Sequence, residues 1–216
     1  MLVAKSNTLQ QAVLGTELHP ETCETDRQLI GDIRCLICGK PVKYNHDRGN
    51  DLFGCFRHAD GSSDCFASDG SSKEHRLAVE VTAKDLYNHI QEVAGPPVEI
   101  DVEKWVGERP SFVITDIRIS RPLKIAVEVY YMINALGLHR RLETMFDNDY
   151  RAYLIFHPGG RHSVDRVERH IHKITSLQVG RFDRATFDVA FGDLFTKERI
   201  DLSNLNEERL PRYIVR

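Results

Sequence analysis

Ser111-Phe-Val-Ile-Thr-Asp-Ile-Arg-Ile-Ser120 is followed, after Arg121-Pro122, by Leu123-Lys-Ile-Ala-Val-Glu-Val-Tyr-Tyr131. Both runs are short and rich in Val and Ile, and a proline separates them. Short apolar runs of this composition favour strands over a helix. We therefore predict that they form two consecutive strands of a hairpin in a buried sheet.

One carboxylate interrupts each of these runs, Asp116 in the first and Glu128 in the second. Burial of an unpaired carboxylate is costly, so a buried acid needs a compensating charge. A divalent cation at the sheet edge would provide it, and oxygen ligands on neighbouring strands are typical of a Mg2+ site for phosphodiester chemistry. The alternative is that both acids point to solvent on an amphipathic hairpin.

The composition is that of an ordinary soluble protein. The chain has 216 residues, of which 41% are hydrophobic and 28% charged, enough for one domain with an appendage or for two modest domains. A net charge of −3 gives no global attraction to nucleic acid, so any such surface would have to be local. We see neither a membrane span nor a signal peptide, and expect a cytoplasmic protein. The oligomeric state stays open, a homodimer included.

The cysteines favour metal binding over a disulfide framework, because they are odd in number and clustered in a chain expected to be cytoplasmic. The five are Cys23, Cys35, Cys38, Cys55 and Cys65. Cys23 lies alone in a polar stretch, and we interpret it as an ordinary free thiol.

The strongest motif is Cys35-Leu-Ile-Cys38-Gly, a tight knuckle that points two thiolates at one metal ion. Downstream, His58 and Cys65 complete a Cys3His set, with Cys55 as a competing ligand. Four such donors fill the tetrahedron of a structural Zn2+ and leave no open position for chemistry. The alternative is a group of reduced thiols beside a surface histidine.

The remaining elements follow from apolar spacing and turn residues, and their order predicts an α/β core with a mixed sheet flanked by helices. They are a small β element in residues 1–19, a helix from 72 to about 90, a strand at 98–105, a helix at 135–146, a strand at 150–156 and a helix at 164–174. We expect three parts: a β-rich zinc-ribbon-like region at 1–67, a core at 68–180 and a C-terminal extension at 181–216. The extension suggests no chemistry.

The order of these motifs resembles the CoiA-like family of competence proteins. The resemblance rests on the Cys-x2-Cys knuckle, Phe56-Arg-His58, Cys65, the Ser-x-x-His of Ser72 to His75, and then an Asp strand and a Glu strand, within roughly residues 1–160. It implies a nuclease of the PD-(D/E)xK, restriction-endonuclease-like fold with an N-terminal zinc-ribbon-like region.

The resemblance also assigns roles to residues. Asp116 and Glu128 take the positions of the acids that hold Mg2+ or Mn2+, His75 takes that of the helix histidine, a phosphate contact or proton donor, and Ser72 that of the helix serine. In this class the cation polarises the scissile phosphate and activates water, while a nearby lysine orients that water.

Three positions depart from the family pattern. Ser71 stands where the family has Glu, Val79 where its helix has Lys, and Tyr130 where a Gln or Lys follows the strand acid. Tyr130 can donate a hydrogen bond but carries no positive charge. The departures therefore put the catalytic charge in question.

Other residues of this chain offer replacements. Lys124 lies four residues before Glu128 and so shares its strand face, Lys84 is a less favoured substitute, and Glu80 or Glu74 would replace the lost helix acid. A surface salt bridge is the alternative for Glu80.

The leading prediction is a Mg2+-dependent or Mn2+-dependent endonuclease that hydrolyses DNA, with a structural zinc. The alternative is a catalytically degenerate module that binds nucleic acid or a protein partner. In that module arginines would contact phosphates, with a solvated helix face as their ordinary alternative. These are Arg140, Arg141, Arg161, Arg166 and Arg169. A third hypothesis is a second metal site on His157, His162, His170 and His172.

Overall fold

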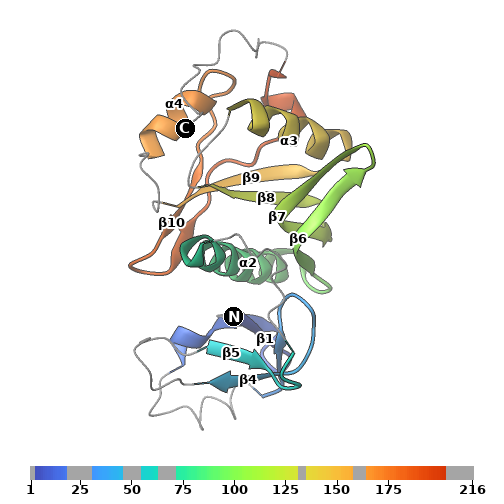
Figure 1. Ribbon diagram of the computed structural model, residues 1–216, viewed down its shortest axis with the longest axis vertical. Coiled ribbons are helices and arrows are strands. Elements are labelled where there is room, and N and C mark those ends of the chain that lie inside the picture. Colours follow the sequence, from blue (N-terminus) through green and yellow to red (C-terminus); the bar gives the residue numbers. More distant parts are fainter. Residues whose placement is uncertain are drawn as a thin grey trace. The chain divides into compact units, whose positions relative to one another are not determined.

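The computed structural model describes residues 3–18, 31–45, 55–62, 72–130, 135–157 and 164–202. The chain divides into two compact units, Met1–Val102 and Glu103–Arg216, and each is described by itself below. The predicted boundary at 67–68 lies outside the described residues, and the compact units divide instead between Val102 and Glu103. Figure 1 gives the elements of both units.

The first unit is rich in short antiparallel strands, as predicted. Its three-stranded sheet has the order β2-β1-β3, with Val3 opposite Leu14 in the first pair and Ala4 opposite Cys35 in the second. A separate two-stranded sheet pairs Val42 with His58. The strands are β1 (Val3–Ser6), β2 (Gln11–Leu14), β3 (Ile33–Cys35), β4 (Val42–Asn45) and β5 (Cys55–His58), and the turn η1 (Gly15–Glu17) follows β2.

Helix α2 (Lys73–Ala94) also belongs to this unit and is joined to the small sheet by hydrogen bonds. It begins as predicted, because the Ser72 side chain accepts from the His75 N–H, and it ends at Gly95 with φ 72°. The Asn88 amide both accepts from and donates to the backbone of Ala12, at 2.7 and 2.9 Å. These bonds satisfy the N–H and C=O groups of Ala12 on the open edge of β2, and so fix the helix to the sheet.

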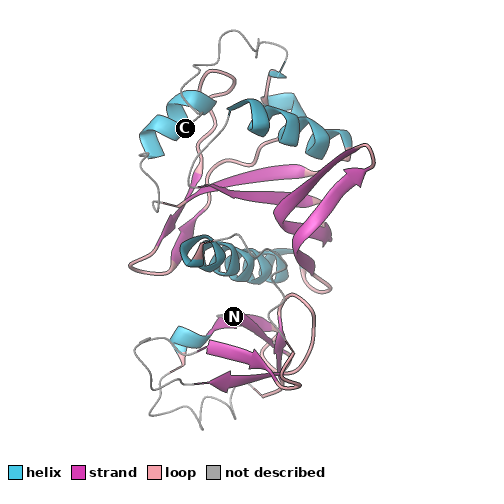
Figure 2. Cartoon of the chain, viewed as in Figure 1, coloured by secondary structure: helices cyan, strands magenta, loops and turns pink. Residues whose placement is uncertain are grey.

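The second unit contains a six-stranded mixed sheet with the order β11-β10-β9-β8-β7-β6. Figure 2 shows the strands of the protein in magenta. The predicted hairpin is confirmed, because β7 and β8 are antiparallel neighbours. Strand β8 is parallel to β9 and β9 to β10, whereas β11 is antiparallel to β10. The strands are β6 (Glu99–Glu108), β7 (Ser111–Arg121), β8 (Ile125–Tyr130), β9 (Arg151–Phe156), β10 (Gly180–Asp183) and β11 (Asp188–Ala190).

Two helices make the parallel crossovers, α3 (Ala135–Asp147) between β8 and β9, and α4 (Val164–Ile171) between β9 and β10. Both lie on one face of the sheet (Figure 1). Their apolar side chains pack with those of the strands into one buried core, which includes Leu138, Leu142, Met145, Ala152, Leu154, Phe156, Val167 and Ile171. The chain is therefore an α/β protein with a mixed sheet and a β-rich N-terminal region, as predicted.

Residues expected to form a C-terminal extension contribute to this sheet. They include most of β10, all of β11 and the short turn η2 (Lys197–Arg199). Phe195 is fully buried and pairs with Ala152 through hydrogen bonds in both directions, each 2.9 Å long. No helix among the described residues is long and apolar enough to cross a membrane.

Candidate metal centre and carboxylate site

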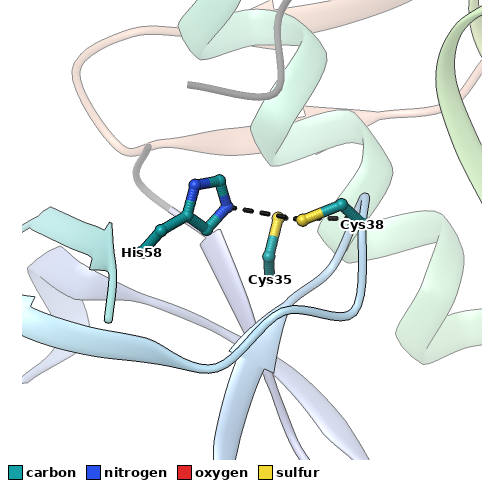
Figure 3. Close-up of side chains that lie close together, drawn as sticks. All are labelled: Cys35, Cys38 and His58. Carbon is teal, nitrogen blue, oxygen red and sulfur yellow. Dashed lines mark hydrogen bonds between the residues drawn. The ribbon is translucent and has the colours of Figure 1, made fainter. Parts of the chain in front are cut away.

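Cys35, Cys38 and His58 converge in the first unit (Figure 3). One ligand atom from each lies within 4.8 Å of the other two, and Cys38 Sγ is 3.4 Å from His58 Nε2. Cys35 ends β3, Cys38 lies in the turn that follows, and His58 ends β5. Two thiols and an imidazole are typical zinc donors, so this cluster can bind a metal ion such as zinc.

The local backbone explains the position of the two thiols. The Cys35 carbonyl accepts from the Gly39 N–H at 3.0 Å, and the Cys35 N–H donates to the Lys40 carbonyl at 2.8 Å. Gly39 has φ 70°, a conformation that favours glycine. The Cys38 N–H lies 3.5 Å from Cys35 Sγ and donates to it. The turn therefore brings both sulfurs to one side before any metal binds.

The imidazole of His58 is oriented from its other nitrogen. Nδ1 lies 3.1 Å from Ser62 Oγ and 3.4 Å from the Ser62 carbonyl. A proton on Nδ1 donated to Ser62 leaves the Nε2 lone pair facing the thiols, which is how an outer contact fixes the tautomer of a ligating histidine. Phe56 is two residues away on the same strand, and its buried ring fixes this strand face in the core.

Ser62 is itself held by two charged residues. Its N–H donates to Asp60 at 2.8 Å, and Lys40 Nζ lies 3.1 Å from both Asp60 Oδ2 and Ser62 Oγ. Hydrogen bonds from Ser62 and then from Lys40 hold the pKa of the Asp60 carboxyl well below its usual range. The fourth predicted ligand, Cys65, and the side chain of Cys55 lie outside the described residues.

Asp116 and Glu128 meet at one end of the β7–β8 pairing in the second unit. The register runs from Ile119 opposite Ile125 to Ile117 opposite Val127, and Asp116 and Glu128 are the next residues at this end of the pairing. They lie close enough for the charge of Asp116 to raise the pKa of Glu128. The Asp116 carboxylate accepts from the Val129 N–H at 2.7 Å. Glu128 is only 3% exposed, so the alternative that both acids point to solvent is wrong for Glu128.

Arg141 enters this site from α3. Its Nη2 donates to Glu128 Oε1 at 2.5 Å and also to the Ile114 carbonyl on β7. Its buried Nε has no hydrogen-bond partner within the part of the chain that the structure describes. The Tyr130 phenol lies close enough to Glu128 and Arg141 for their charges to shift its pKa. We call Asp116, Glu128, Tyr130 and Arg141 the carboxylate site.

Burial and a neighbouring acid change the acidity of the carboxylate site. Burial, and then the charge of Asp116, raise the pKa of Glu128 to about 8, although Arg141 acts in the opposite direction. Burial and the charge of Glu128 also raise the pKa of Tyr130 well above its ordinary value. Both carboxylates carry the kind of oxygen donor that Mg2+ and Mn2+ prefer.

Arg141 is the residue of this site for which the sequence analysis proposed no role beside the acids. It follows Leu138 by three residues and precedes Met145 by four, and both of these are buried in the core. Position 141 thus lies on the apolar stripe of a predicted amphipathic helix. An arginine in such an apolar stripe is the sequence signal from which a buried acidic partner could have been predicted.

The other predicted catalytic residues are Lys124, Glu80 and His75. Lys124 precedes β8, and its Nζ donates to the Asn148 carbonyl at 3.3 Å and lies 3.9 Å from Asp149. Glu80 accepts from the Val3 N–H at 3.1 Å, and His75 lies in the first turn of α2. Glu80 and His75 belong to the first unit, whereas the carboxylate site belongs to the second.

Among the described residues, Cys35, Cys38 and His58 are the only three or more His, Cys, Asp or Glu residues close enough to share a metal ion. The hypothesis of a second metal site on four histidines stays untested, because residue 162 and the side chain of residue 170 lie outside the described residues.

Comparisons with models of protein families, with curated proteins and with solved structures find no match for this chain.

Proposed function

We propose that this protein is a nuclease of the PD-(D/E)xK, restriction-endonuclease-like type that hydrolyses DNA with Mg2+ or Mn2+. The observation that carries the proposal is the pairing of Asp116 and Glu128, two acids from neighbouring strands that share a buried site with one arginine. The connection β7–β8–α3–β9, in which an antiparallel hairpin leads into a parallel crossover, supports the proposal.

The chain's own residues would divide the work as follows. Asp116, whose carboxylate accepts from the Val129 N–H, would supply one carboxylate ligand of the cation, and Glu128 would supply the second. A cation bound there would polarise the scissile phosphate and lower the pKa of an attacking water. The Tyr130 hydroxyl would orient that water by a hydrogen bond. Glu128 is only 3% exposed, so the groups around it keep bulk water away from its carboxylate.

An aromatic pair with an exposed tryptophan, in the same unit, supports a nucleic-acid partner. Trp105 and Phe112 stack with ring centroids 4.2 Å apart, and the Arg109 guanidinium lies 5.8 Å from the centroid of the Trp105 ring. Trp105 is 44% exposed. Flat rings beside a guanidinium are suited to stacking with a base and attracting its phosphate.

For the first unit we propose a structural zinc held by Cys35, Cys38, His58 and a fourth ligand. Cys65 is our choice for the fourth ligand, with Cys55 as the competitor. Zinc content measured for Cys65→Ser and Cys55→Ser decides between them, because only loss of the true ligand lowers it toward zero.

A second candidate function is a catalytically degenerate module that binds nucleic acid or a protein partner without cutting. The observation that favours it is the bond of Arg141 to Glu128, since a guanidinium already neutralises one of the two acids. Position 130 holds a tyrosine where an active nuclease of this type would have a lysine or a glutamine, and this also favours the module without catalysis.

Plasmid nicking separates the two candidates. Supercoiled DNA is incubated with the full-length protein and Mg2+ or Mn2+, and the wild type is compared with Asp116→Asn and Glu128→Gln. Asp147→Asn, an exposed acid at the end of α3, is the matched control. We expect both site variants to lose nicking by at least about a hundredfold while the control retains it. Equal nicking in all variants, or salt-sensitive binding without nicking, contradicts the nuclease proposal.

A further inference from the structure

We propose that Arg141 competes with a divalent cation for Glu128: its guanidinium bonds Glu128 Oε1, and it turns to the scissile phosphate when a divalent cation binds to that carboxylate. This inference rests on the proposed nuclease function and deepens it. It assigns to α3 the positive charge that the family motif would place at Val79 or Tyr130.

The first support is the geometry of the arginine. One nitrogen, Nη2, donates both to Glu128 Oε1 and to the Ile114 carbonyl. The bond to Ile114 is to backbone and does not depend on a carboxylate. It can therefore keep the guanidinium at the site while the bond to Glu128 breaks. The remaining donors of the guanidinium then face a new partner.

The second support is competition for the same oxygen. A cation bound by Asp116 and Glu128 needs carboxylate lone pairs, and Arg141 holds Oε1 of Glu128 at 2.5 Å. A divalent ion would also repel the guanidinium at this distance. The arginine and the cation therefore compete for Glu128. We expect that removing the arginine strengthens cation binding.

The third support is the chemistry of the guanidinium. Arginine binds phosphate with two parallel N–H donors, and it stays charged at any pH of interest. Its Nε is buried and has no hydrogen-bond partner among the described residues, so this donor is available to a ligand. A phosphate oxygen would satisfy it.

The test measures cation binding in the absence of DNA. Mn2+ is titrated into the full-length, zinc-loaded protein by calorimetry, for the wild type, Arg141→Gln and Arg141→Lys. Arg151→Gln is the control, an exposed arginine at the start of β9. We expect Arg141→Gln to bind Mn2+ about tenfold more tightly than the wild type. Arg141→Lys keeps the charge with a single ammonium and should bind with intermediate affinity, while the control matches the wild type.

Nicking at saturating Mn2+ then tests the second half of the inference. We expect Arg141→Gln to nick about a hundredfold more slowly despite its tighter cation binding, because a donor to the phosphate is lost. Arg141→Lys provides the result if Arg141→Gln does not fold, as judged by its melting curve. A structural role would change both readouts in the same direction.

Equal or weaker Mn2+ binding by Arg141→Gln, or by Arg141→Lys in its place, overturns the inference. Failure of the proposed function gives a different result: no variant nicks DNA, while the Mn2+ titrations still decide whether the arginine and the cation compete. Tighter Mn2+ binding with unchanged nicking overturns the transfer of Arg141 to the phosphate.

Discussion

The cysteine cluster of the first unit and the carboxylate site of the second differ in how their charges are balanced. In the cluster, Ser62 orients His58 so that its Nε2 faces the thiols. In the carboxylate site, Arg141 already bonds one of the acids. A metal ion would complete the first arrangement, whereas it would compete with a protein group in the second. We therefore expect a firmly held zinc in one unit and an exchangeable cation in the other.

The largest expected effect is the loss of zinc from the first unit. Cys35→Ser should lower the zinc content from about one ion per chain to near zero and abolish the ordered fold of the first unit, because zinc binding contributes on the order of 10 kcal/mol to such small domains. Elemental analysis and thermal unfolding measure the two effects. Cys23→Ser, expected to be an ordinary free thiol, is the control. A variant that keeps its zinc and its melting curve removes the structural metal from the account.

The next effect concerns the acidity of Glu128. Because the pKa of Glu128 is raised to about 8 in the folded chain, its carboxyl stays protonated there at pH values at which the unfolded chain has lost the proton. The folded state therefore loses stability as the pH rises from about 5 to 8. The slope approaches about 1.4 kcal/mol per pH unit for one proton.

Glu128→Gln removes this dependence and is the reference. Urea unfolding of both proteins without added divalent cation, at pH 5, 6.5 and 8, measures the difference in stability. The single tryptophan, Trp105, lies in the second unit and reports its unfolding by fluorescence. We expect the wild type to lose stability relative to Glu128→Gln as the pH rises. A constant difference shows that Glu128 is an ordinary ionised partner of Arg141.

A smaller effect is expected at the outer contact of the zinc cluster. Ser62→Ala removes the Oγ contact that orients His58, so the zinc affinity should fall by about tenfold or more. Competition with a coloured chelator measures it, and Ser176→Ala, an exposed serine of the second unit, is the control. Unchanged affinity means that the Ser62 carbonyl alone is enough to fix the ring.

The smallest effect is expected at the aromatic pair with the exposed tryptophan. Trp105→Ala should weaken the binding of a labelled single-stranded oligonucleotide about fivefold, since a stacked base contributes on the order of 1 kcal/mol. Fluorescence anisotropy at low salt measures the affinity. Leu123→Ala, which removes another exposed apolar side chain of this unit, should leave it unchanged. Equal losses in both variants indicate nonspecific apolar contact.

The sequence predicted correctly those strands, helix ends and turns that are determined by residues close together in the chain. The Val-rich and Ile-rich runs around Asp116 and Glu128 form the expected hairpin, because β-branched composition and a separating proline leave few alternatives. The start of α2 at Ser72 was also predicted, because a serine side chain can accept a hydrogen bond from an N–H of the first helical turn. The Cys-x2-Cys spacing likewise predicted a knuckle that the Gly39 turn builds from neighbouring residues alone.

Contacts between residues that are distant in the sequence were harder to predict. Strands β10 and β11 are short, and Gly180 packs against Ile155. The spacing of apolar residues along the sequence does not predict such a contact. Arg141 was considered only as a surface phosphate contact, although its place between Leu138 and Met145 put it on the buried stripe of α3. Lys124 was expected to share a strand face with Glu128, but it precedes β8 and its Nζ donates to the Asn148 carbonyl.

The most direct test of the central claim, a divalent cation held by the two strand acids, is a Mn2+ titration of the zinc-loaded full-length protein. We predict that the wild type binds one Mn2+ ion beyond its zinc, and that Asp116→Asn and Glu128→Gln each weaken this binding by at least about tenfold, since each removes a charged ligand. Mn2+ binding that is absent from the wild type, or unchanged in both variants, would contradict the claim.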